Sequence, residues 1–266
     1  MKTNRIITGD CVKEMKGLPT ETFDAILTDP PYGVTTDLDD YVATGFLKEA
    51  YRVLKPDAAL MMFVGQATIR EFWNAAESAG FTWLNTIVWH YKNTIKRERK
   101  KLAIQYDPIL YFSKGGFVHN LDNVRVPYLN PERLKYPCNN SKKTGWMPNP
   151  KGAICGDVWE SPAINAANGT DPSFGHKWQK PLVICERMVQ CTCNPGDLIL
   201  DPFCGSGTQC VAAKNCGVDF VGIEVDEDFA KLARDRISGQ NSGKVHKRKV
   251  HENLANSRKM IDIFED

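Results

Sequence analysis

Residues 198–208 read LILDPFCGSGT, and this stretch decides the fold. The apolar run Leu198–Leu200 predicts a strand that is buried on both faces. Gly205 and Gly207 follow in a tight turn, where they allow a positive φ and a close approach of the backbone to a ligand. A helix predicted from Thr208 would offer its unpaired N–H groups to an anionic group. A buried strand, a glycine turn and a helix N-terminus together predict one corner of a parallel α/β sheet.

An acidic residue follows this turn at an informative spacing. Glu224 ends the next predicted strand, Asp219–Ile223, and lies 17 positions beyond Gly207. At this place in such sheets, a carboxylate accepts hydrogen bonds from the hydroxyls of an adenosine ribose. The chain lacks the Gly-Lys-Ser/Thr ending of a P-loop, and Cys210 replaces the third glycine of a dinucleotide fingerprint. The pattern therefore favours a bound nucleoside.

The rest of the chain alternates predicted strands and helices. Apolar and β-branched runs predict strands at 5–8, 23–28, 58–64, 81–91, 107–113, 198–200 and 219–223. Apolar residues at helical spacing predict helices at 46–54, 66–79, 181–191, 208–216 and 226–237. This alternation predicts an α/β protein with a mostly parallel sheet and helices on both faces. Ligands of such sheets bind at the carboxyl ends of the strands.

Two segments break this pattern. Residues from about 115 to 178 are rich in proline, glycine and asparagine and show little periodicity. A structureless loop of that length is uncommon inside a compact domain, so we predict a functional insertion there. The tail at 241–266 is polar and includes a basic run.

The end of the second predicted strand combines residues suited to a flat amine. Asp29 supplies a carboxylate and Tyr32 an aromatic face. Between them, the consecutive prolines Pro30 and Pro31 leave a carbonyl oxygen that is not needed for hydrogen bonding within the sheet. An aryl amine is a poor nucleophile because its lone pair is delocalised into the ring. Two acceptors for its N–H groups favour the pyramidal nitrogen that can attack a methyl group, and the tyrosine could stack on a base that has left its helix.

Composition bounds the class of protein. The 266 residues are 42% hydrophobic, 25% charged and 10% aromatic, which excludes disorder, a collagen and a disulfide-built miniprotein. No run approaches the ~18 apolar residues of a membrane helix, and the N-terminus lacks a signal-peptide core. We therefore expect a cytoplasmic protein with no membrane partner. The nine cysteines lack zinc-site spacing, so we expect reduced thiols and no metal.

The two motifs resemble those of the S-adenosylmethionine-dependent DNA amino-methyltransferases, in the β arrangement that places the catalytic motif before the cofactor motif. Asp29–Tyr32 is similar to the catalytic motif and Asp201–Thr208 to the cofactor motif. Gly9-Asp10-Cys11 resembles the family's adenine-contacting turn, and 156–159 resembles a further signature. Residues 176–181 resemble a segment that lies against the methionine end of the cofactor; there Lys177 and Trp178 depart from the family pattern, so only the last three residues carry over.

This resemblance implies a Rossmann-like methyltransferase fold, with a seven-stranded, mostly parallel sheet in permuted chain order. It divides the chain into a catalytic part at 1–114, a target recognition insertion at 115–175, a cofactor-binding part at 176–240 and the polar tail. It implies S-adenosylmethionine as cofactor and Asp29, Pro30, Pro31 and Tyr32 as catalytic residues. The implied cofactor-binding residues are Asp10, Cys11, Gln179, Lys180, Pro181, Asp201, Phe203, Gly205, Ser206, Gly207, Thr208 and Glu224.

The implied reaction is methyl transfer to the exocyclic N6 of a flipped adenine, direct and without a covalent enzyme intermediate. Adenine is favoured because Asp29 occupies the first motif position, where family members acting on cytosine N4 more often have serine. Methylation of cytosine N4 remains an alternative, as does a non-catalytic nucleic-acid-binding protein on the same fold. The motif order disfavours ribosomal-RNA and protein-glutamine methyltransferases, which place the glycine turn first.

The expected partner is double-stranded DNA. A basic cluster after the strand at 81–91 is interpreted as an edge that contacts phosphates; its DNA-binding residues are Lys96, Arg97, Arg99, Lys100 and Lys101. A solvated charged face with no DNA contact is the alternative. Neither a homodimer nor a companion restriction enzyme is decided by the sequence.

Overall fold

The computed structural model describes residues 1–31, 40–91, 102–116, 120–135, 147–164, 171–176 and 178–240. Its eight described strands are β1 (Arg5–Thr8), β2 (Phe23–Thr28), β3 (Leu54–Phe63), β4 (Thr82–His90), β5 (Tyr106–Ser113), β6 (Val158–Glu160), β7 (Leu198–Asp201) and β8 (Asp219–Glu224). The described α-helices are α1 (Cys11–Lys16), α2 (Asp40–Val53), α3 (Ile69–Ala79), α4 (Leu182–Thr192), α5 (Thr208–Asn215) and α6 (Glu227–Ile237). Two short 3₁₀ helices, η1 (Leu121–Val124) and η2 (Pro131–Lys135), lie in the predicted insertion.

All eight strands form one sheet in the order β1-β8-β7-β2-β3-β5-β4-β6. Only β5 runs antiparallel to its neighbours among these strands. The predicted α/β class and the mostly parallel sheet are thus confirmed. The predicted number of seven strands is one too low, because three residues of the irregular stretch pair with β4 as β6.

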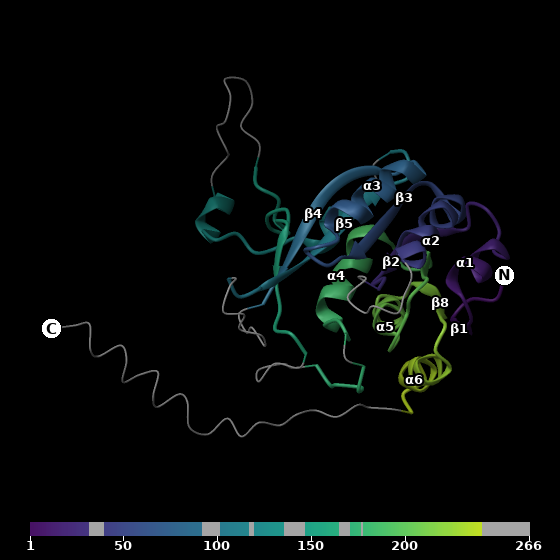
Figure 1. Ribbon diagram of the computed structural model, residues 1–266. Coiled ribbons are helices and arrows are strands. Elements are labelled where there is room, and N and C mark those ends of the chain that lie inside the picture. The colour runs from purple at the N-terminus through teal and green to yellow at the C-terminus, as the bar shows by residue number, and fades with distance from the viewer. Residues whose placement is uncertain are drawn as a thin grey trace.

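Helices cover both faces of this sheet (Figure 1). Alternate residues of β3 point to opposite sides: Met61 belongs to the buried cluster that includes residues of α4, α5 and α6, whereas Leu60 and Met62 belong to the cluster that includes residues of α1, α2 and α3. This alternation of side chains along a strand produces one buried apolar layer on each face. None of the helices in the described part of the chain is both long and apolar enough to span a bilayer.

Most predicted elements lie within a few residues of the observed ones. The helix α1 was missed because it has only six residues, too few for a periodic pattern. Strand β3 begins at Leu54, four residues before the predicted Ala58, with a register shift against β2 after Phe23. Both ends of the predicted insertion pack on the sheet: Val124 and Trp159 belong to its core, whereas every residue of η2 is exposed.

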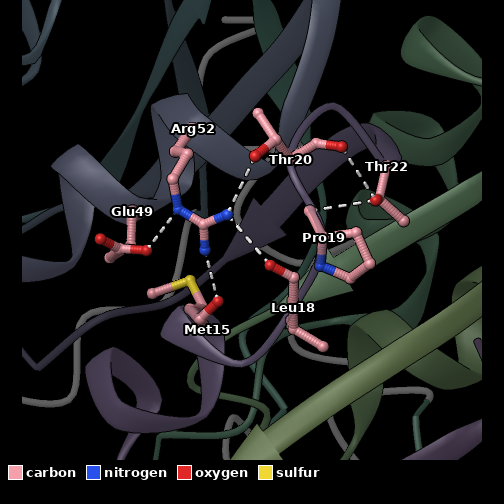
Figure 2. Close-up of polar contacts among 7 residues, drawn as sticks. All are labelled: Met15, Leu18, Pro19, Thr20, Thr22, Glu49 and Arg52. Atoms are coloured by element: carbon pink, nitrogen blue, oxygen red, sulfur yellow. Dashed lines mark hydrogen bonds and ion pairs between the residues drawn. The ribbon is translucent and has the colours of Figure 1, made fainter.

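Arg52 of α2 fixes the connection that leads into β2 (Figure 2). Its guanidinium donates hydrogen bonds to the carbonyl oxygens of Met15, at 2.6 Å, and Leu18, at 3.0 Å. Its Nε donates to Glu49 Oε2 at 2.8 Å. Two donors of this planar group therefore hold the end of α1 against α2, and the third bonds to a residue of α2 itself. This clamp lies just before β2, the strand that Asp29 follows.

Candidate active site

The two sequence motifs meet at the carboxyl edge of the sheet. Strand β2 lies beside β7, with Ala25 opposite Ile199. At their ends, the Thr28 hydroxyl donates a hydrogen bond to Asp201 Oδ1 at 2.8 Å, although the two residues are 173 positions apart. Thr28 is fully buried and immediately precedes Asp29. One buried hydrogen bond therefore joins the strand end of the predicted catalytic motif to that of the predicted cofactor motif.

Asp29 forms an ion pair with Lys180 at this edge. Lys180 Nζ lies 2.5 Å from Asp29 Oδ2, and the two side chains are only 8% and 19% exposed. The ammonium also lies over the ring of Phe63, 5.0 Å from its centroid, at the end of β3. The apolar ring and the low exposure strengthen the attraction between the two charges relative to a surface pair. Lys180, predicted at the methionine end of the cofactor, thus contacts the predicted catalytic carboxylate directly.

The glycine turn is built as the sequence predicts. Gly205 and Gly207 have φ of +49° and +76°. A Cβ at Gly207 would lie 3.0 Å from that of Ala233 on α6, and one at Gly205 would lie 3.2 Å from His176 Nε2. Glycine is therefore favoured at both positions, because these positive φ values strain other residues and a Cβ would crowd Ala233 or His176.

Glu224 faces this turn from the end of β8. Its Oε2 accepts a hydrogen bond from Gly205 N at 2.8 Å, and its Oε1 accepts one from Asp226 N at 3.0 Å. The backbone N–H of Gly9 donates to the Glu224 carbonyl at 2.8 Å, which brings the predicted adenine-contacting turn alongside. A carboxylate fixed by two backbone donors keeps lone pairs for further donors, such as hydroxyl groups.

Asp201 is the most buried acid of the site. It is 2% exposed, and its Oδ1 accepts hydrogen bonds from the Thr28 hydroxyl and from Phe203 N. Burial raises the pKa of Asp201 to about 8, and the nearby carboxylates of Asp29 and Glu224 act in the same direction. The protonated form of this acid is therefore favoured at neutral pH.

The other predicted cofactor residues serve the local structure. Asp10 Oδ1 accepts from Lys13 N at 2.8 Å and caps α1. Burial raises the pKa of the adjacent Cys11 thiol to about 12. Gln179 holds the segment before α4 in place. Its Oε1 accepts a hydrogen bond from Phe174 N and its Nε2 donates one to the Pro172 carbonyl, both at 3.0 Å.

Pro181 and Phe203 have structural positions as well. Pro181 is the N-cap of α4, and the ring of Phe203 lies edge-on to that of Phe46.

Arg236 of α6 clamps the glycine turn. Its Nη1 donates to Thr208 Oγ1 at 2.8 Å and to the Ser206 carbonyl at 3.2 Å. Its guanidinium stacks over the ring of Phe174, 4.2 Å from the centroid. Burial lowers the pKa of Arg236. This one side chain therefore joins the turn, the helix after it and the segment that precedes α4.

Comparison with known proteins identifies the family. The N6_N4_Mtase family of DNA methylases matches residues 23–235. The chain belongs to this family. Two curated relatives of this methylase are the Type II methyltransferase M.HpaI of Haemophilus parainfluenzae, 31% identical over 90% of this chain and 76% of its own, and the DNA adenine methyltransferase YhdJ of Escherichia coli K12, 27% identical over 98% and 93%.

Solved structures share its fold. The complex of M1.HpyAVI with SAM superposes on the methylase with a TM-score of 0.62, at 21% identity, over 88% of this chain and 98% of the other. The PvuII DNA methyltransferase, described as cytosine-N4-specific, gives 0.66 at 14% identity over 96% and 91%. The relatives thus include both kinds of target amine.

The methylase site also holds residues that motif reasoning missed. Arg236 belongs to no motif. The only feature of the sequence that could have indicated it is its position in the last turn of the charged helix after Glu224. His176 was named in the family-like segment but not selected; its ring lies against Gly205 and edge-on to Phe229. Asp107 lies on β5 and Tyr91 directly follows β4, and neither residue belongs to a motif. Tyr32 and the five predicted DNA-binding residues at 96–101 lie outside the described residues.

Proposed function

We propose that this methylase transfers a methyl group from S-adenosylmethionine to the exocyclic N6 of adenine in double-stranded DNA. The observation that supports this most is the hydrogen bond between Thr28 and Asp201, which brings the Asp29 carboxylate and the glycine turn to one edge of the sheet. A methyl donor held at the turn and an amine held at Asp29 would then be neighbours. Proximity of this kind supplies much of the acceleration of a direct transfer.

Asp29 is proposed to accept a hydrogen bond from the target amine, together with the Pro30 carbonyl. In such a transfer the nitrogen would bond to the methyl carbon while the sulfur keeps the electrons of the broken carbon–sulfur bond, and the nitrogen would carry positive charge until it releases one proton to solvent. A carboxylate in a site of low exposure stabilises that charge more strongly in the transition state than in the ground state. Adenine is proposed over cytosine because Asp29 stands first in the motif and because YhdJ is a DNA adenine methyltransferase.

The residues around the glycine turn fit S-adenosylmethionine. Within the described part of the chain, the buried Nδ1 of His176 has no hydrogen-bond partner, and its ring faces the turn. Burial lowers the pKa of His176, so its neutral form offers one ring nitrogen as an acceptor. We propose that Glu224 binds the ribose hydroxyls and that the turn 205–208 lies against the methionine part. The cofactor supplies an activated methyl group on a sulfonium.

The remaining predictions concern DNA. The target base is proposed to leave the helix and to stack on Tyr32, because its amine cannot reach Asp29 inside a duplex. The basic residues at 96–101 are proposed to contact phosphates, and residues 115–175 are proposed to read the DNA sequence.

A restriction-modification context is proposed from M.HpaI, a Type II methyltransferase. A cytoplasmic location accords with a DNA substrate.

The test is a methyl-transfer assay with tritiated S-adenosylmethionine, followed by analysis of the nucleosides. N6-methyladenine is the expected product, and N4-methylcytosine would overturn the proposed target. Asp29→Ala should slow single-turnover transfer roughly 100-fold or more, the scale of removing one preorganised electrostatic partner. The control Glu77→Ala removes an exposed acid near the opposite edge of the sheet, at the end of α3, and should leave the rate unchanged. A wild-type rate for Asp29→Ala would refute the proposed active site.

A further inference from the structure

Arg236 brings a positive charge to the interior beside the glycine turn. From the last turn of α6, its Nη1 donates to Thr208 Oγ1 at 2.8 Å, to the Ser206 carbonyl at 3.2 Å and to Ser206 Oγ at 3.4 Å. Thr208 and Ser206 are only 6% and 3% exposed. Among the described residues, the hydrogen-bond partners of this guanidinium are hydroxyls and a carbonyl, with no carboxylate. The cation is therefore held by the turn itself and not by an ion pair.

This contact determines how the Thr208 hydroxyl can be used. A guanidinium only donates hydrogen bonds, so it occupies a lone pair of the hydroxyl oxygen. The Thr208 proton must then point away from Arg236, toward another acceptor. A hydroxyl that accepts from a cation is also polarised, which makes it a stronger donor. Arg236 therefore sets both the direction and the strength of this donor.

Thr208 is the first residue of α5, where an anionic acceptor fits. The N-cap residue Gly207 has no side chain to cap the helix, and Val211 N makes the first helical hydrogen bond, to the Gly207 carbonyl at 2.9 Å. The N–H groups of residues 208–210 precede this ladder and have no partner within the helix. A carboxylate in front of them could accept from these groups and from the Thr208 hydroxyl together. The methionine part of S-adenosylmethionine ends in such a carboxylate.

The ring of Phe174 holds the guanidinium in place. Its centroid lies 4.2 Å from the guanidinium carbon of Arg236. Phe174 is itself fixed, because its backbone N donates to Oε1 of the buried Gln179 at 3.0 Å. A cation over an aromatic face is attracted more strongly where water is excluded. The planar group is thus held against the turn by a ring from the segment before α4.

We propose that Arg236 is a positioning residue for the cofactor: it directs the hydroxyl proton of Thr208 toward the carboxylate of the methionine part of S-adenosylmethionine. This inference rests on the proposed function, which places the methionine part against the turn. Arg236 acts through Thr208, so its effect on cofactor binding requires the Thr208 hydroxyl. A general effect of Arg236 on the packing of the turn would not require it.

The test is a double-mutant cycle of Arg236→Met and Thr208→Val, in which calorimetric titration of the full chain gives the dissociation constant of S-adenosylmethionine. Thr208→Val should weaken binding roughly tenfold or more, the scale of one hydrogen bond to a charged group. Arg236→Met should weaken it about fivefold, within the range for residues that share one hydrogen-bond network. In the Thr208→Val background, Arg236→Met should add less than about a twofold loss, because the hydroxyl it acts on is gone.

A conservative variant and a matched control complete the design. All three hydrogen bonds leave from one nitrogen of Arg236, so the ammonium of Arg236→Lys can replace them. Its dissociation constant should stay within about threefold of the wild type, because only the stacking on Phe174 is weakened. The control Lys214→Met removes another cation between α5 and α6, whose Nζ donates to the Ile237 carbonyl at 2.7 Å. It lies in the last turn of α5, away from Thr208, and should leave cofactor binding unchanged.

Melting temperatures without cofactor show which variants fold. If Arg236→Met does not fold, Arg236→Gln takes its place in the cycle, because glutamine keeps an N–H donor without the charge. In single-turnover methyl transfer, Arg236→Met should raise the cofactor concentration needed for half the maximal rate. The rate at saturating cofactor should stay within about twofold of the wild type, as expected when uniform binding is lost.

The outcomes separate this proposal from the proposed function. An unchanged dissociation constant for Arg236→Met would overturn the role of Arg236, and so would a fivefold loss that persists in the Thr208→Val background. An unchanged constant for Thr208→Val would overturn the placement of the methionine part at the turn, and the role of Arg236 with it. A cytosine product in the methyl-transfer assay would overturn the target base alone and leave the cycle valid.

Discussion

Replacement of Asp201 by asparagine tests the electrostatics of the site most directly. The asparagine side chain is nearly isosteric with the protonated acid, and its Oδ1 can accept the hydrogen bonds now donated by Thr28 and by Phe203 N. The substitution therefore removes one titration and leaves the packing in place. Its effect on stability should depend on pH, in a direction that the raised pKa of Asp201 determines.

The magnitude follows from linkage. Burial raises the pKa of Asp201 from an ordinary value of 3.8 to about 8. Between these values the native state retains a proton that the unfolded chain has lost, so the wild type loses stability as the pH rises. One pKa unit corresponds to about 1.4 kcal/mol, which gives a loss of up to about 4 kcal/mol between pH 5 and pH 8. Asp201→Asn should lack this loss, with nearly wild-type stability at pH 5 and greater stability at pH 8.

Urea denaturation without cofactor, followed by circular dichroism at pH 5, 6, 7 and 8, measures this difference. The control Glu77→Gln removes an exposed carboxylate and should differ from the wild type by less than about 0.5 kcal/mol at each pH. If the stability difference between Asp201→Asn and the wild type is the same at pH 5 and pH 8, Asp201 is ionised in the native state and the reasoning is wrong.

Three further predictions concern the scaffold, the cofactor and DNA. Arg52→Met should lower the free energy of unfolding by about 2–3 kcal/mol, because two backbone carbonyls lose a charged donor; an unchanged urea midpoint would contradict the clamp. Glu224→Gln should weaken S-adenosylmethionine binding by about 1.5 kcal/mol in calorimetric titration, since one charged acceptor is lost; an unaltered dissociation constant would remove Glu224 from the site. Neutralising Lys100 and Lys101 should weaken binding of all DNA sequences alike and reduce the log–log salt slope by up to ~2; a loss confined to one sequence would mean that these residues read bases.

The sequence predicted the elements that depend on residues near one another in the chain. The glycine turn after Leu200 and the spacing to Glu224 could be predicted, because a strand, a turn and a helix start are each defined within a few residues. The Asp-Pro-Pro end of the second strand could be predicted for the same reason. The six-residue α1 and three-residue β6 were missed, because elements this short contain too little of a repeating pattern.

The sequence by itself determined the α/β class, the two motifs and the family, since all three are patterns along the chain. Only the tertiary structure decided which side chains meet between the motifs. Lys180 and Asp29 are 151 positions apart, and the antiparallel direction of β5 alone brings Asp107 to their edge of the sheet. The raised pKa of Asp201 likewise cannot be predicted from the sequence, because desolvation depends on what packs around a carboxylate and not on its neighbours in the chain.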